Sequence, residues 1–179
     1  AAALPAAQGS AAIVAGSCSQ ATQRQVRHAI EAGVPALAID PLHIAAGVDV
    51  AAQVLAWARP WLGQRPLLVY STADARALAA VQSSLGIDAA GAMVERTLAA
   101  IAAGLVDQGV GRLIVAGGET SGACVQALGI GRLRIGPQID PGVPWCHAVR
   151  PSSGRGLHLA LKSGNFGGDD FFTRAFELL

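Results

Sequence analysis

The stretch LIVAGGETSGACVQALGI, residues 113–130, decides the fold class. Its apolar start is typical of a buried strand, and an amphipathic segment typical of a helix follows the glycines, acid and hydroxyls of residues 117–122. A strand that turns sharply into a helix is the repeating unit of α/β domains. The turn has two interpretations: a tight turn before a capped helix, or a phosphate site at a helix N-terminus.

The same alternation of short apolar runs and Ala-rich segments continues through the chain. It predicts an α/β domain with an open, mainly parallel, Rossmann-like sheet and helices on both faces, in which strands of the last third add antiparallel pairing. Residues 1–10 are expected to be a loose lead-in or linker, and residues 11–179 a single domain. The expected strands are residues 11–15, 34–39, 66–70, 112–116, 133–139, 143–149 and 157–162. The expected helices are residues 20–32, 47–61, 73–83, 88–108, 169–178 and a segment from Thr120 or Ser121 to Leu128.

Composition excludes several classes of function. Apolar residues make up 52% of the 179 residues and charged residues 14%, which argues against disorder. A net charge of +1 gives no basic surface for nucleic acid or an anionic membrane, and no uninterrupted apolar run is long enough to span a bilayer. Three scattered cysteines and four scattered histidines match no disulfide framework or metal-ligand spacing. These features favour a protein of the reducing cytoplasm with no metal-binding motif of its own, and homo-oligomer formation is compatible with them.

Three loops are expected at the carboxyl ends of the strands, where open α/β sheets bind ligands. They contain residues 16–19, 117–122 and 162–167. Glycines allow close approach of the backbone, helix N-termini and hydroxyls donate hydrogen bonds, and a lysine supplies a mobile point charge for phosphate oxygens. The candidate nucleotide-binding residues are Ser17, Ser19, Gly117, Gly118, Glu119, Thr120, Ser121, Gly122, Lys162, Ser163, Gly164 and Asn165.

Each loop alone has an ordinary structural explanation. A Gly-Ser turn is more often a helix cap, and a lysine after a strand is usually solvated. Glu119 repels phosphate; it either has a structural role, orients a base or ribose, or reaches Mg²⁺ through water. The chain lacks GxxxxGK[ST], a GxGxxG after the first strand, and GxSxG, which argues against P-loop kinases, ordinary NAD enzymes and serine hydrolases.

Together the loops resemble a known family. GSCSQATQRQV (residues 16–26), VAGGETSGACVQALGI (115–130), PGVP (141–144) and LALKSGNFGGDDFF (159–172) occur in this order. They resemble the C-terminal nucleotide-binding domain of the four-carbon acid sugar kinases. The resemblance implies transfer of the γ-phosphate of ATP, with Mg²⁺, to the terminal hydroxyl of a sugar acid such as a 3-oxo-tetronate. It also implies nucleotide contacts on the three loops named above.

The resemblance further implies a two-domain kinase whose N-terminal domain binds the sugar acid. The acidic, glycine-bearing motif of that domain has no counterpart here, and the chain starts with alanine, so we expect a piece that binds nucleotide but is inactive alone. Its catalytic base stays unassigned, with Asp40, Glu119 and Asp140 as strand-end candidates. The alternatives are a non-catalytic module that senses a nucleotide or sugar phosphate, and a scaffold domain whose glycines serve packing.

Overall fold

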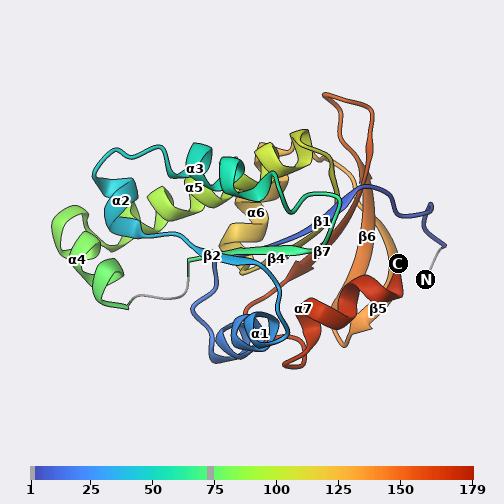
Figure 1. Ribbon diagram of the computed structural model, residues 1–179, viewed down its shortest axis with the longest axis horizontal. Helices are drawn as coiled ribbons and strands as arrows, with labels where there is room; N and C mark the ends of the chain where they lie inside the picture. The colour runs from blue at the N-terminus through green and yellow to red at the C-terminus, as the bar shows by residue number, and fades with distance from the viewer. Residues whose placement is uncertain (1–2, 72–74) are drawn as a thin grey trace.

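The computed structural model describes residues 3–71 and 75–179, and it contains a seven-stranded sheet in the order β2-β3-β1-β4-β7-β6-β5 (Figure 1). Strands β2, β3, β1, β4 and β7 run parallel, whereas β6 is antiparallel to both β7 and β5. The strands are β1 (Ser10–Ala15), β2 (Ala36–Ala38), β3 (Leu67–Tyr70), β4 (Val110–Ala116), β5 (Arg134–Asp140), β6 (Val143–Val149) and β7 (Gly156–Lys162). The predicted mixed α/β sheet is therefore confirmed.

Helices cover both faces of the sheet, as predicted (Figure 1). The helices are α1 (Gln20–Glu31), α2 (Pro41–Ala45), α3 (Val50–Ala58), α4 (Ala75–Leu85), α5 (Ile87–Asp107), α6 (Gly118–Ala127), α7 (Phe171–Arg174) and the 3-10 helix η1 (Ala175–Leu178). Because side chains alternate along a strand, Ala12 and Val14 pack with α3, α5 and α6, whereas Ile13 and Ala15 pack with α1 and α7. The sheet thus separates two apolar cores.

Trp145 on β6 anchors the second core. Its side chain is fully buried, its Nε1 donates a hydrogen bond of 2.8 Å to the carbonyl of Ala175, and its ring lies 5.8 Å from that of Phe176. This contact attaches the C-terminal helical segment to the antiparallel strands.

Several element boundaries differ from the predictions. The short helix α2 was not predicted; the Asp40 side chain starts it by accepting a hydrogen bond of 2.8 Å from the Leu42 amide. Strand β2 is shorter than residues 34–39, and the C-terminal helix is a single α turn followed by a 3-10 segment. Of the helix expected at residues 73–83, the first two positions lie outside the described residues.

Residues 3–9, part of the segment expected to be a lead-in or linker, contact the domain at several points. Leu4 packs against the second core, and the Pro5 carbonyl lies 3.0 Å from Nε2 of the buried His158. Gly9 accepts a hydrogen bond of 2.9 Å from Arg112. These contacts lie at the amino ends of β4 and β7, away from the predicted ligand edge.

Helix α5 is the longest helix that the structure describes. It is long and apolar enough to cross a bilayer by length and composition, but half of it is buried inside the domain. It packs against β1, β4, α3 and α6. It also carries Glu95 and Arg96 near its middle. This helix is therefore a core helix of the α/β layer.

Candidate functional site

The three predicted loops meet at the carboxyl ends of β1, β4 and β7. The Gly16 amide donates to the Ala116 carbonyl and the Gly117 amide to the Lys162 carbonyl, both at 2.8 Å. The chain leaves β1 toward β2 and β3 on one side, while β4 lies on the other. This is the topological switch point, where open α/β sheets form a ligand crevice. The spatial convergence inferred from sequence is therefore confirmed.

The first loop is a helix cap that also contacts the third loop. Ser19 is the N-cap of α1; its Oγ accepts from the Thr22 amide at 3.2 Å and donates to the Gly164 carbonyl at 2.6 Å. The Ser19 amide donates to Ser17 Oγ at 3.1 Å. A Cβ added to Gly164 would lie 2.4 Å from Ser17 Oγ, so a larger residue there would displace the Ser17 side chain.

The second loop leaves the start of α6 open. The helix begins after Gly117, whose φ of +120° suits glycine, so the helix start predicted at Thr120 or Ser121 is two or three residues too late. No side chain caps this N-terminus, and Gly118, Glu119 and Gly122 are exposed. Nothing lies within 4 Å of a Cβ added to Gly118 or Gly122. The first amides of a ten-residue helix therefore border free space, the arrangement that binds anions.

The hydroxyls of this loop point inward instead of capping the helix. Thr120 is buried and donates to Glu95 Oε1 of α5 at 3.3 Å. Ser121 Oγ is buried and has no hydrogen-bond partner among the described residues. Burial raises the pKa of Glu95, the Thr120 hydroxyl partly offsets this, and the nearby Glu119 carboxylate raises it further. Glu95 is thus a site residue that the sequence analysis missed.

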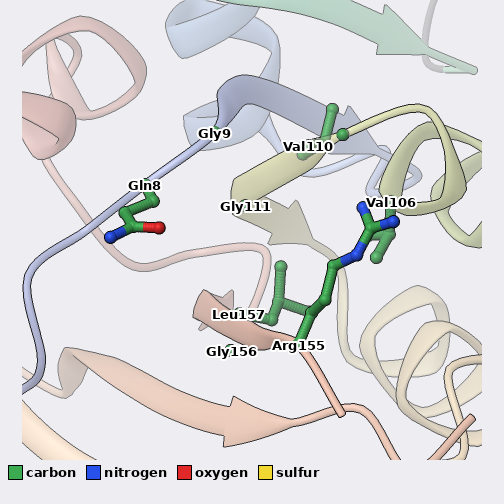
Figure 2. A pocket seen from close by; sticks show the side chains of 9 residues that line it. Gln8, Gly9, Val106, Val110, Gly111, Arg155, Gly156 and Leu157 are labelled. Carbon is green, nitrogen blue, oxygen red and sulfur yellow. The ribbon is translucent and has the colours of Figure 1, made fainter. Parts of the chain in front are cut away.

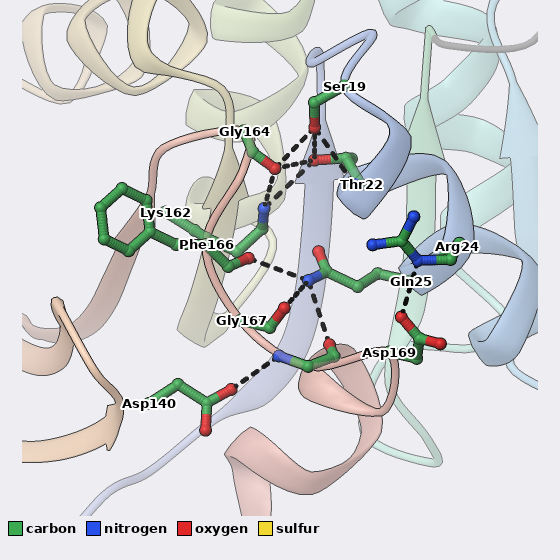
Figure 3. A network of polar contacts seen from close by, with 11 residues as sticks. Ser19, Thr22, Arg24, Gln25, Asp140, Lys162, Gly164, Phe166, Gly167 and Asp169 are labelled. Carbon is green, nitrogen blue, oxygen red and sulfur yellow. Dashed lines mark hydrogen bonds and ion pairs between the residues drawn. The ribbon is translucent and has the colours of Figure 1, made fainter.

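Lys162 lies differently from the mobile charge that we expected. It is the chain's single lysine, and its side chain is fully buried on the face of β7 that packs against α1. Its Nζ donates to Thr22 Oγ1 at 3.1 Å and to Gly164 O at 2.9 Å (Figure 3). It also donates to Ser163 O at 3.1 Å. All three ammonium hydrogens therefore have protein acceptors, and the lysine fixes the third loop onto α1.

Gln25 continues this network along α1. Its buried Nε2 lies within 3.1 Å of the carbonyls of Phe166, Gly167 and Gly168 (Figure 3). Together with Lys162 it holds five carbonyls of residues 163–168 toward the protein. Among described residues, the buried polar side chains are Thr22, Gln25, Thr120, Ser121, Lys162 and His158, and all but His158 lie at this edge. Ser163 and Asn165 remain exposed.

Two of the three proposed catalytic acids have structural partners. Asp40 caps α2, and Asp140 accepts from the Gly168 amide at 3.0 Å and pairs with Arg174. Burial acts to raise the pKa of Asp140, but the Gly168 amide and Arg174 lower it overall. Glu119 alone lies exposed at the start of α6. The described residues contain no cluster of three or more His, Cys, Asp or Glu that could hold a metal.

The titration of Lys162 gives a first prediction. Burial lowers the pKa of its ammonium from 10.5 to about 8. Between these values the unfolded chain binds more protons than the folded chain, so this group's contribution to the free energy of unfolding rises with pH across that window. NMR of protein labelled with ¹³C-lysine should show one side-chain signal with a midpoint near pH 8. A midpoint at the ordinary lysine value would contradict the burial of the ammonium.

A separate cavity of about 350 Å³ lies at the opposite edge of the sheet (Figure 2). It is formed by Gln8 and Gly9 of the N-terminal segment and by the amino ends of β4 and β7. Arg155 is its charged lining residue and extends across it toward Val106 (Figure 2). Its described lining contains no helix N-terminus and no further charged group, so the switch-point edge remains the candidate site.

The fold and the open helix N-terminus at the switch point define a nucleotide-binding α/β domain. The chain belongs to the family of nucleotide-binding C-terminal domains, whose family model matches residues 12–172. It is 54% identical over its whole length to the 3-oxo-tetronate kinase of Burkholderia multivorans and covers 41% of that protein. It is 40% identical over 93% of its length to the enzyme of the same name from Salmonella typhimurium, covering 39% of it.

Solved structures share this fold. The crystal structure of Haemophilus influenzae protein HI1011 superposes with a TM-score of 0.84 at 39% identity, covering 96% of this chain and 41% of that one. A Bordetella bronchiseptica protein, described as a domain-swapped dimer with bound citrate, shares the fold at a TM-score of 0.71 and 22% identity, covering 94% of this chain and 41% of that one. The chain thus spans about 40% of the relatives it matches.

Proposed function

We propose that this chain is the ATP-binding part of a kinase that phosphorylates a four-carbon sugar acid, 3-oxo-tetronate or a close relative, at its terminal hydroxyl. The observation that carries the proposal is the exposed, uncapped N-terminus of α6 at the switch point, flanked by the loops of Ser17 and Gly164. The names of the relatives supply the sugar-acid class. Residues 11–179 form the nucleotide-binding unit, with the preceding segment as its linker.

In this proposal the polyphosphate lies over residues 117–122. The amides of Gly118 and Glu119 donate to phosphate oxygens, because the N-terminus of α6 has positive dipole character and no side-chain partner. The exposed hydroxyl of Ser163 and amide of Asn165 add donors from the third loop. Lys162 and Gln25 act indirectly by holding that loop's carbonyls away from the ligand. Phosphoryl transfer depends mainly on such positioning and on charge neutralisation.

Magnesium fits this site as an ion held largely by the nucleotide. Mg²⁺ is usually bound by one or two carboxylates together with substrate phosphates and water, and Glu119 is the exposed carboxylate beside the proposed phosphates. When bound, the ion would neutralise phosphate charge.

We further propose that a part of the protein outside this chain binds the sugar acid and supplies the catalytic base. Asp40 and Asp140 are engaged in structural contacts, which leaves Glu119 as the candidate acid on these loops. The alternative, a non-catalytic module that senses a nucleotide or sugar phosphate, is supported by the same observation, since two of the three candidate bases have structural roles. The three unpaired cysteines fit a reducing cytoplasm.

A coupled ADP-release assay tests the division of labour. The isolated chain should bind ADP by calorimetry but release none from ATP with a panel of four-carbon sugar acids. The chain with the upstream part of its own reading frame should turn over. Losing general-base assistance alone costs about two to four orders of magnitude in rate, and losing substrate positioning costs more. Comparable turnover by the isolated chain would refute the two-part proposal and implicate Glu119 as the base.

A further inference from the structure

A cavity of about 430 Å³ opens directly beside the start of α6. It is bounded by α4, by the first half of α5, and by the first two site loops. Gly16 and Glu119 belong both to the candidate site and to this lining, so the cavity continues from the proposed phosphate position. Its size lies within the range of about 300–1,000 Å³ typical of small-molecule sites.

We propose that this cavity receives the nucleoside end of the nucleotide, with the base between the apolar walls and the ribose near Glu119. The inference rests on the proposed function and extends it, because that proposal places only the phosphates of the nucleotide. A single nucleotide would then span both parts of the site, with its phosphates over α6 and its uncharged end in the cavity.

The negative charge of the lining argues against an anionic group in the cavity. Asp88, Glu95 and Glu119 all line the cavity, and the described lining contains no lysine or arginine. A polyphosphate or a sugar-acid carboxylate placed among these acids would be repelled, since like charges at short range cost free energy in a partly buried site. The cavity therefore accepts the neutral end of the ligand.

The remaining chemistry of the lining suits a base and a ribose. Leu78, Ile87 and Val94 supply apolar walls, as expected for a pocket that encloses a flat heterocycle. The lining carboxylates can accept hydrogen bonds from ribose hydroxyls or an exocyclic amine. Glu95 Oε2 is buried and has no hydrogen-bond partner among the described residues. A buried acceptor without a partner is unfavourable, so a ligand donor that reaches it would strengthen binding.

Gly91 provides a sharp test because it lines the cavity on α5 and has nothing within 4 Å of an added Cβ. In Gly91→Leu the new side chain should occupy the cavity, while the helix gains propensity over glycine. Calorimetry should show ADP affinity lowered at least about tenfold, or ~1.4 kcal/mol. Ala100→Leu, on an exposed position of the same helix, is the matched control and should bind ADP as the original chain does.

NMR titration of the unaltered chain with ADP locates the nucleoside independently. The amides of Gly91 and Ala92 should shift together with those of residues 117–122. Shifts at residues 117–122 without any at Gly91 and Ala92, or full ADP affinity in Gly91→Leu, would overturn this inference and leave the proposed function intact. No shift and no heat with ADP would instead overturn the proposed function itself.

Discussion

The substitution Gly118→Val will lower the affinity for ADP at least about a hundredfold, or ~2.8 kcal/mol. Gly118 is the first residue of α6, is exposed, and has open space around an added Cβ, so the protein itself can accommodate valine. The branched side chain would occupy the volume in which a phosphate reaches the first helix amides. Isothermal titration calorimetry measures the loss, and circular dichroism should remain native.

Ala127→Val is the control for this prediction because it introduces the same side chain at an exposed position near the far end of the same helix. It should leave both ADP affinity and the spectrum unchanged. Undiminished affinity in Gly118→Val would place the phosphates away from the N-terminus of α6. Equal loss in both variants would point to a general effect of valine on the helix.

Gly16→Ala will lower the free energy of unfolding, because an added methyl group at Gly16 meets closer neighbours than one at Gly117 or Gly164. Its Cβ would lie 2.1 Å from Thr120 Oγ1 and 2.8 Å from Leu98 Cδ1, and both of those side chains are buried. Overpacking of this kind costs about 1–3 kcal/mol, and displacing the Thr120 hydroxyl also removes its hydrogen bond to Glu95. Urea unfolding should therefore show a midpoint shifted to lower denaturant with an unchanged slope.

A double-mutant cycle identifies the clash. Thr120→Ala removes the oxygen that the new methyl group meets, so the double variant should be more stable than the sum of the single effects predicts. Gly131→Ala is the neutral control because Gly131 is exposed and an added Cβ meets nothing within 4 Å. Additive effects in the cycle would show that Thr120 is not the obstacle.

The sheet and the meeting of three loops could be predicted because they depend on local patterns. Continuous apolar runs such as residues 11–15 and 113–116 indicate parallel strands buried on both faces, and their carboxyl ends share one edge. The start of α6 could not be assigned from capping preferences alone. Thr120 is a good cap by residue type, yet tertiary packing turns its hydroxyl toward Glu95 on another helix.

The missed site residues are polar side chains embedded in apolar helical faces. Glu95 lies in a long helix whose pattern indicates only a core face, and Thr22 and Gln25 lie on the buried side of α1. For α1, the sequence signal was that Thr22 and Gln25, three positions apart, lie on the helix face that should be apolar. Their partner, Lys162, is distant in sequence, and its burial depends on the pairing of β4 with β7.

The single buried lysine has a chemical consequence beyond its part in the loop. Reagents that acylate amines react with the unprotonated, accessible form, and this chain offers them no exposed lysine side chain. Acylation of Lys162 must wait for the segment after β7 to detach from α1. Its rate therefore measures how often that segment opens, and the protection gained on adding ADP would report how strongly a ligand closes it.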